Sequence, residues 1–464
     1  MEQQKGDSKN DQPIWIPGND SNRKRYTCKY EKLLGDTYRK HEIIVFFEKP
    51  PTDDEVNKIK ETFREEGIDP ATIKVRKCNN CNIPIQLWQA PNIHCVISAN
   101  GVRAGSGPPI ITVGESYSLN FLNRIPQDNR EGIKKYKVGK VKASEKKENI
   151  VVAVLDTGID TKLVDEKYIW KGNANSQYPC YKDVTTGWNF LNETTDFSDD
   201  EPGRHGSIVS QYIINQFQNS PSNAVQIMPL KTHDANGISD LFSIICAIHF
   251  AIAKGANIIN ASWGFYYYFE KPISYLQQLI TQALQQSGIL FVTASGNKIA
   301  EYDEIAKNLY YATHGVPITP DQLRNLFIHN FYPAILSNDE NSVITVTTTD
   351  GKTVSPTQNY SSMYADLGVL ADKVTNDGMK FQVPFQGASP SDLISGSSFA
   401  AAIASGVIGA FVKKGVYRAG INKADVFASL ATSGGSGGIP VLLSTAPSLE
   451  KKHIKKGRYT RKTG

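Results

Sequence analysis

The sequence contains no long hydrophobic run. Its most apolar stretch, residues 399–412, is interrupted by Ser405 and Gly406 and is shorter than the ~20 residues of a membrane-spanning helix. We therefore expect no membrane span and interpret this stretch as a core helix. The N-terminal residues MEQQKGDSKNDQPIWIPG also lack an apolar signal segment, so the cytoplasm is the expected location.

Cysteine is scarce, with six residues in a chain of 464. Without an export signal, reduced thiols are the simplest expectation. Four residues of zinc-ligand type lie near one another and are weak candidates for a metal site: Cys78, Cys81, His94 and Cys95. The alternative is a β-hairpin with reduced thiols, because the adjacent His94 and Cys95 would point apart on a strand.

The body of the chain carries no strong charge of one sign. The 51 basic and 46 acidic residues give a net charge of +5. Residues 450–464 hold seven Lys/Arg and one Glu, a net +6, which leaves −1 for the rest. Nucleic acid is therefore not an expected partner, and residues 448–464 are interpreted as a solvated basic tail.

Composition and patterning indicate two folded parts in a soluble globular chain, with 40% hydrophobic and 21% charged residues. Residues 1–25 are polar and are interpreted as a flexible lead-in. Residues 26–148 have the pattern of a small α+β module followed by a charged linker. In residues 149–447, apolar strands alternate with helices, which predicts an α/β fold with a mainly parallel sheet covered on both faces. The expected strands there are 150–155, 224–230, 256–260, 289–293 and 343–347, and the expected helices are 239–254, 273–287 and 398–412.

Four polar residues stand where these strands end or helices begin. Asp156 follows one strand and Asn297 another, while His205 and Ser398 begin helical segments. Because functional sites of open α/β sheets gather beyond the carboxyl ends of the strands, the four residues are candidates for one site. A serine, a histidine and an aspartate together make a nucleophilic triad, and an asparagine amide is a donor for the developing oxyanion.

The segments around these residues resemble the subtilisin-like serine proteases over about residues 149–445. The matching blocks are LDTGID, HGSIVS, INASWG, TASGN and GSSFAAAIASG. The resemblance implies a subtilisin-like three-layer fold and a serine endopeptidase that acts on protein or peptide substrates without a catalytic cofactor. It assigns Asp156, His205 and Ser398 as the triad and Asn297 as the oxyanion donor. It also implies a substrate-binding role for Ser262, Trp263, Gly264, Ser295 and Gly296. Two locations are open for the Trp263 side chain, the wall of the substrate pocket and the core.

Some features depart from the family pattern or leave alternatives open. Residues 299–331 look like an insertion that edges the substrate cleft. The acidic residues Asp196, Asp199, Asp200 and Glu201 are candidates for structural calcium, but a solvated acidic loop is the simpler interpretation. LDTG also occurs in aspartic proteases, whose all-β fold the helical patterns oppose. A different class of function is a latent or inactive scaffold whose triad is occluded by the insertion.

The N-terminal module, residues 26–148, has two candidate roles. It resembles a propeptide of β-α-β texture, which would be released by cleavage near residues 142–147. Alternatively it stays attached and binds a regulatory partner that licenses activity. Its length, which exceeds that of a minimal propeptide, favours the second role.

Overall fold

The computed structural model describes residues 13–14, 33–79, 81–96, 116–125, 148–172, 180–269, 272–298, 300–376, 378–385, 388–432, 441–444 and 449–450. Most of the predicted lead-in, the charged linker at 126–147 and the tail from residue 451 lie outside these ranges. No helix within them is both long enough and apolar enough to cross a bilayer.

The centre of the molecule is a parallel sheet of seven strands in the order β6-β7-β5-β9-β11-β13-β14. Its strands are almost continuously buried, as expected for a parallel sheet covered on both faces. Two antiparallel strands, β18 and β19, extend the edge beyond β14. The strands are β5 (Glu148–Asp156), β6 (Trp188–Asn189), β7 (Asn223–Lys231), β9 (Ile258–Ala261), β11 (Leu290–Ala294), β13 (Val343–Thr349), β14 (Leu367–Leu370), β18 (Val441–Ser444) and β19 (Leu449–Glu450).

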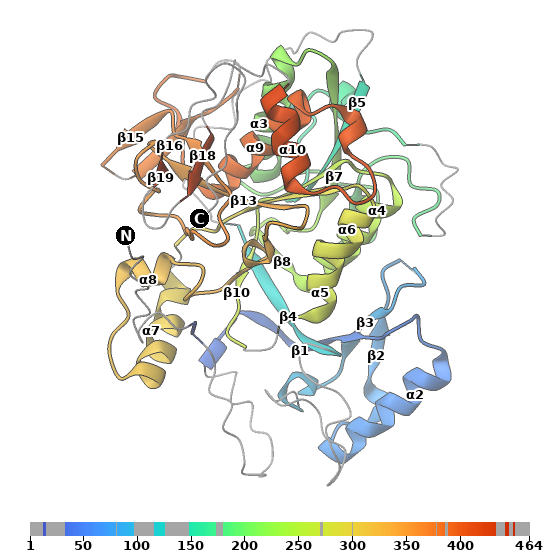
Figure 1. Ribbon diagram of the computed structural model, residues 1–464. Helices are drawn as coiled ribbons and strands as arrows, with labels where there is room; N and C mark the ends of the chain where they lie inside the picture. The colour runs from blue at the N-terminus through green and yellow to red at the C-terminus, as the bar shows by residue number, and fades with distance from the viewer. Residues whose placement is uncertain are drawn as a thin grey trace.

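Helices cover both faces of this sheet, which confirms the predicted α/β class (Figure 1). Successive side chains of a strand point to opposite faces. Accordingly, Val152 and Val154 of β5 pack with one group of helices, and Ala153 and Leu155 pack with the other. The first group is α3 (His205–Gln216), α9 (Ser397–Phe411) and α10 (Lys423–Thr432); the second is α4 (Leu241–Ala253), α5 (Ser274–Gln278) and α6 (Leu284–Gln286), the last two joined by a π-helical turn, Leu279–Ala283.

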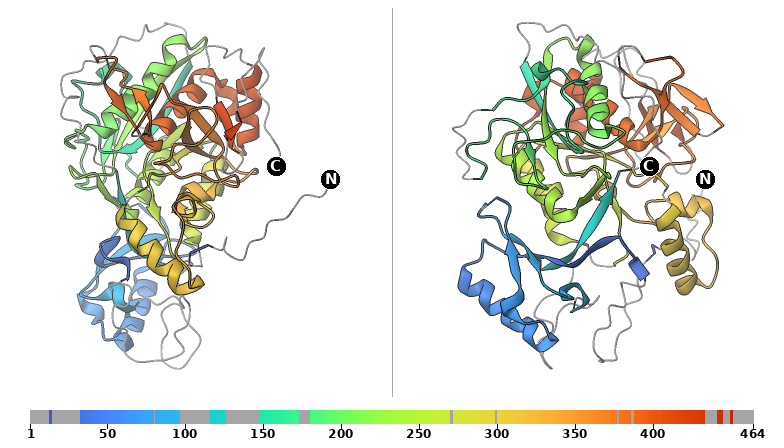
Figure 2. Two further views of the ribbon diagram at one scale, coloured as in Figure 1. Left: turned by 90° about the vertical axis from the view of Figure 1, so that its left-hand side faces the viewer. Right: turned by 180° about the vertical axis from the view of Figure 1, so that it is seen from behind.

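The N-terminal module forms an antiparallel sheet in the order β2-β3-β1-β4, and β8 of the α/β domain adds a fifth strand beside β4. In Figure 2 this blue module lies at one end of the molecule, below the α/β domain. It covers α4, which is apolar on all sides and buried along nearly its whole length, as a helix between two layers must be. Its elements are β1 (Tyr38–Phe46), α2 (Asp53–Thr62), β2 (Lys74–Arg76), β3 (Ile85–Gln89) and β4 (Tyr117–Arg124), and β8 spans Ile238–Asp240.

The segment interpreted as an insertion forms two helices at the edge of the molecule, α7 (Ala300–His314) and α8 (Pro320–Arg324) (Figure 1). The chain then returns through β12 (Phe331–Tyr332), which pairs with β10 (Phe265–Tyr266). This pairing joins the end of the insertion to the strand that directly follows Gly264. A small separate sheet contains β15 (Lys373–Thr375), β16 (Gly378–Gln382) and β17 (Leu393–Ile394).

Candidate active site

A buried hydrogen bond joins the predicted aspartate of the triad to the predicted base. Asp156 is the last residue of β5, and His205 is the first residue of α3. The Oδ1 atom of Asp156 lies 2.8 Å from Nδ1 of His205 and also accepts the N–H of Thr157 at 2.8 Å. A carboxylate at Nδ1 fixes the orientation of the imidazole and leaves Nε2 for proton transfer.

This contact requires a glycine next to the histidine. A Cβ atom on Gly206 would lie 2.4 Å from the carbonyl oxygen of Gly158, a distance that no side chain tolerates. Gly158 itself has a φ of +108°, in the region that favours glycine. The start of α3 therefore meets the loop after β5 backbone to backbone, which brings His205 to Asp156.

The acidic segment before His205 binds the beginning of α3. Oε2 of Glu201 accepts the N–H of His205 at 3.0 Å. Oδ2 of Asp199 accepts the N–H of Ser207 at 3.0 Å and its hydroxyl at 2.6 Å. Carboxylates at a helix N-terminus satisfy free N–H groups and interact favourably with the helix dipole. The expectation of a solvated loop is therefore wrong for Asp199 and Glu201, which are buried. Calcium binding remains a prediction.

Two buried residues outside the predicted site, Lys231 and His233, contact the loop after β5; the sequence analysis did not identify Lys231. Lys231, at the end of β7, donates to the carbonyl oxygens of Thr157 and Ser198, both at 2.8 Å, and pairs with Asp200. The N–H of His233 donates to the carbonyl oxygen of Asp156 at 3.2 Å. Burial lowers the pKa of His233 to about 3, so its ring is neutral. The signal in the sequence was a lysine directly at the end of an apolar strand.

Ser398 lies in the first turn of α9, where the helix N-terminus favours developing negative charge. Its hydroxyl donates to the carbonyl oxygen of Ser262 at 3.2 Å, and the Ser262 hydroxyl donates to the carbonyl of Ser398 at 2.9 Å. The ring of the next residue, Phe399, lies 5.3 Å from the ring of His205 between centroids. The turn that carries Ser398 is thus packed against His205, and the hydroxyl must rotate away from Ser262 to reach it. Such catalytic contacts often form only when substrate binds.

The side chain of Asn297 is held by the same helix. Its Oδ1 accepts the N–H of Ser397 at 3.0 Å and the Ser397 hydroxyl at 3.2 Å. Because the amide oxygen is used in this way, the Nδ2 group remains as the donor that the resemblance predicts for an oxyanion. Tyr266 also donates its hydroxyl to the Asn297 carbonyl at 3.1 Å, which fixes the backbone of this segment.

The two predicted substrate-binding segments lie side by side because β9 and β11 are parallel neighbours in register, with Ala261 opposite Thr293. Ser262–Gly264 follows β9, and Ser295 and Gly296 follow β11. Trp263 is buried, and its ring contacts Phe291 edge to face. Its side chain therefore belongs to the core and not to a pocket wall.

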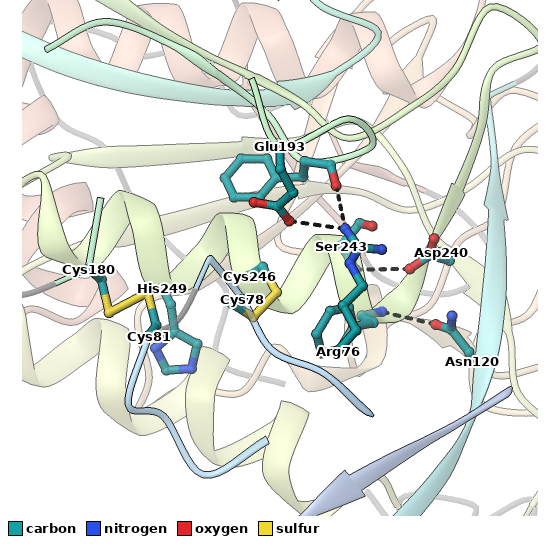
Figure 3. The surroundings of a disulfide bond; sticks show 12 residues. Arg76, Cys78, Cys81, Asn120, Cys180, Glu193, Asp240, Ser243, Cys246 and His249 are labelled. Atoms are coloured by element: carbon teal, nitrogen blue, oxygen red, sulfur yellow. Dashed lines mark hydrogen bonds and ion pairs between the residues drawn. A yellow bond between two sulfur atoms is a disulfide. The ribbon is translucent and has the colours of Figure 1, made fainter. Parts of the chain in front are cut away.

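The cysteines differ from the prediction. Cys78 is bonded to Cys246 of α4, and Cys81 to Cys180, with Cα–Cα distances of 5.5 and 4.9 Å (Figure 3). Cys95 is also disulfide-bonded. The reduced-thiol and zinc predictions are both wrong, because the disulfides remove the thiolates that a zinc ion would need. His94 instead accepts the N–H of His41 at its Nδ1, at 2.9 Å. Separations of 168 and 99 residues left no signal of these pairings in the sequence.

Nucleophilic catalysis by serine uses a carboxylate that is hydrogen-bonded to an imidazole, together with a serine at the start of a helix. Residues 147–430 match the model of the subtilase family. Since the match covers more than half of the chain, the protein belongs to the subtilase family, and the resemblance found in the sequence is confirmed.

Known proteins show the same relationship. The chain is 28% identical over 244 residues to Subtilisin-like protease 1 of Plasmodium berghei (strain Anka), covering 47% of this chain and 37% of that one. It is 33% identical over 136 residues to the Cell wall-associated protease of Bacillus subtilis (strain 168), a match that covers 28% of this chain and 14% of that one. The matches thus span little more than a third of these relatives at most. The crystal structure of fervidolysin from Fervidobacterium pennivorans has a TM-score of 0.50 at 13% identity, over 91% of this chain and 61% of that one, a likeness of fold.

The burial of Asp199 predicts a pH-dependent stability. Burial raises its pKa from 3.8 to about 6. Between these values the folded protein keeps a proton that the unfolded chain releases, so the free energy of unfolding falls as the pH rises through this window. We expect Asp199→Asn, made in the Ser398→Ala background, to flatten this fall by on the order of 3 kcal/mol. Urea unfolding at several pH values measures it. Asp196→Asn, on the same segment but exposed, is the control. The prediction would be contradicted if the free energy of unfolding depended on pH equally in the wild type and in Asp199→Asn.

Proposed function

We propose that this protein is a serine endopeptidase that hydrolyses peptide bonds of protein or peptide substrates through an acyl-enzyme. The observation that carries the proposal is the buried Asp156–His205 hydrogen bond beside the helix turn that holds Ser398. A serine hydroxyl becomes a nucleophile when a base of fixed tautomer takes its proton, and the packing of Phe399 on the His205 ring supports this role for the neighbouring Ser398.

In the proposed reaction, His205 removes the proton of Ser398 as the hydroxyl attacks the substrate carbonyl, and it then protonates the leaving amine. Asp156 stabilises the imidazolium. The Nδ2 group of Asn297 and the N–H of Ser398 bind the oxyanion. A water molecule, deprotonated by His205, then attacks the acyl-enzyme ester; His205 returns the proton to Ser398, and the carboxylic acid product is released. Ser262–Gly264 pairs with the substrate backbone as an added strand, a mode of binding in which main-chain hydrogen bonds supply the affinity.

We further propose that the N-terminal module restrains the enzyme and remains attached to it. The support is its interface with the α/β domain. Oδ1 of Asn120 accepts the N–H of Phe242 at 3.0 Å, and Arg76 donates to Phe190 O at 2.9 Å and pairs with Glu193 at 3.0 Å. Figure 3 shows these contacts beside the two disulfides. Cleavage of the linker alone would not release a module that is bonded twice to the α/β domain.

The last described residues of the module lie beside a loop of the α/β domain that also contacts the triad. Arg124 pairs with Ile238, and the N–H of Ile125 donates to the carbonyl of Gly237 at 2.8 Å. Gly237 belongs to the loop after His233, and the backbone N–H of His233 donates to the carbonyl oxygen of Asp156. The end of the module is therefore linked to Asp156 through a single loop, residues 233–237, which supports an inhibitory role. A separate regulatory partner of residues 26–148 remains a second prediction.

The disulfides also bear on the location of the protein. Stable disulfides are typical of oxidising compartments and rare in the cytosol. We therefore propose that the protein resides in an oxidising compartment, in place of the cytoplasmic location expected from the sequence.

A latent state is the second candidate, favoured by the Ser398 hydroxyl donating to Ser262 and not to His205. Wild-type protein and Ser398→Ala are compared for casein digestion and for labelling by a serine-reactive phosphonate. We expect digestion and labelling by the wild type alone. Labelling without digestion would indicate the latent enzyme, and the absence of both, even after removal of the module, would contradict the triad.

Asn297→Ala tests the oxyanion donor. We expect kcat to fall by about 10²–10³, equivalent to about 2.7–4 kcal/mol, the magnitude known for the corresponding donor in subtilisin. KM should change little because the donor acts on the transition state. Kinetics on a peptide substrate measure both constants, and the melting temperature serves as the folding control. A large rise in KM with unchanged kcat would contradict the assigned role.

The covalent attachment of the module is tested by cutting the Lys-rich linker of the Ser398→Ala protein with trypsin. We expect the two parts to stay in one band on a non-reducing denaturing gel and to separate after dithiothreitol. Peptide mapping without reductant should identify the Cys78–Cys246 and Cys81–Cys180 links. In the control, replacing Cys180 and Cys246 with Ser should let the parts separate without reductant. Separation of the unsubstituted protein without reductant would refute the attachment.

A further inference from the structure

Two glycines, Gly264 and Gly296, lie on the two segments that would hold the substrate. Gly264 ends the segment after β9, and Gly296 precedes Asn297 after β11; these strands are parallel neighbours. A carbonyl held by Asn297 and attacked by Ser398 must present the side chain of its own residue close by. Because Ser262 contacts Ser398 directly, that side chain enters between these two segments.

The ring of Phe331 fills the space that the glycines leave. A Cβ atom on Gly264 would lie 2.2 Å from Cε1 and 2.3 Å from Cζ of this ring. A Cβ atom on Gly296 would lie 2.7 Å from Cε1 and 2.8 Å from Cδ1. One aromatic ring therefore packs against both backbones at once, and Phe331 is only 5% exposed.

The ring is fixed in this position by its neighbours. Phe331 pairs with Tyr266 across β12 and β10, and the two rings meet edge to face at 5.0 Å. Tyr266 stacks on His329 at 3.8 Å and donates its hydroxyl to the carbonyl of Asn297. Burial lowers the pKa of His329 to about 4, so the stack stays uncharged at neutral pH. An aromatic cluster from the end of the insertion is thus tied to the oxyanion segment, and the ring cannot leave without unpacking it.

We propose that Phe331 sets the specificity of the enzyme by shortening the pocket for the residue whose carbonyl is attacked, so that small side chains such as alanine, serine and glycine are accepted and large ones are rejected. The inference rests on the proposed peptidase function and extends it to the class of substrate. A well-packed core does not yield to an added side chain without strain, so a bulky residue cannot displace the ring at low cost.

The test compares three peptides that differ only at this residue, with Ala, Leu or Phe, on the wild type and on Phe331→Ala. For the wild type we expect kcat/KM for the Ala peptide to exceed that for the Phe peptide by at least about 100-fold, since hydrophobic pockets discriminate 10–200-fold per methylene. Phe331→Ala should reduce this ratio at least tenfold by raising the rate on Leu and Phe peptides. Phe331→Leu, which keeps most of the volume, should give an intermediate ratio and serves where the alanine variant fails to fold.

Phe381→Ala is the control variant, because Phe381 is a fully buried phenylalanine that packs in the other core cluster. It should lower stability without changing the ratio between peptides. A wild type that cleaves the Phe peptide as well as the Ala peptide, or a Phe331→Ala variant whose rates all change by one factor, would overturn the inference while the peptidase function stands. Absence of both cleavage and phosphonate labelling would instead overturn the proposed function and this inference with it.

Discussion

The site depends on one buried hydrogen bond, between Asp156 and His205. A carboxylate and an imidazole are costly to bury unless they are paired, and here they pair with each other. Thr157 donates to the carboxylate, and Glu201 accepts the backbone N–H of His205. Lys231 links the loop after β5 to the acidic segment before α3 through the carbonyl groups of Thr157 and Ser198. The acidic segment before α3 is therefore part of the framework that positions the base.

A second constraint acts on the face of the central sheet opposite to α3 and α9. Helix α4 is apolar on every side, so the face that turns away from the central sheet must be covered. The N-terminal module covers it, adds β4 to β8, and is bonded through Cys78 to Cys246. The burial of α4 and the proposed restraint of the site thus depend on one interface. This connection explains why a module described as a propeptide by its texture is fixed so firmly to the domain it would leave.

Much of the fold could be predicted from the sequence, because apolar strands and helices of a parallel sheet have distinct periodicities. The four polar residues at strand ends and helix starts could be found for the same reason, since the sheet brings these ends together. The burial of Asp199 and Glu201 could not, because their partners are backbone groups that appear only when α3 is docked. The disulfides were missed because their cysteines are distant in the chain.

The proposed role of Phe331 could not be predicted from the sequence for a related reason. Its contact with Gly264 and Gly296 depends on the path of the insertion, in which α7 and α8 return the chain to β12. Local propensity does not encode that path. The insertion could be recognised by its length and composition, but the residue that it delivers to the site could be identified only from the packing.

The central claim is that the Asp156–His205 pair activates Ser398, and Asp156→Asn tests it most directly. The asparagine keeps the shape of the side chain but does not hold the imidazole in the tautomer that accepts the serine proton. The rate of phosphonate labelling of Ser398 should then fall by about 10³–10⁴, while the melting temperature shows that the fold is retained. Labelling of Asp156→Asn at the wild-type rate would contradict the account.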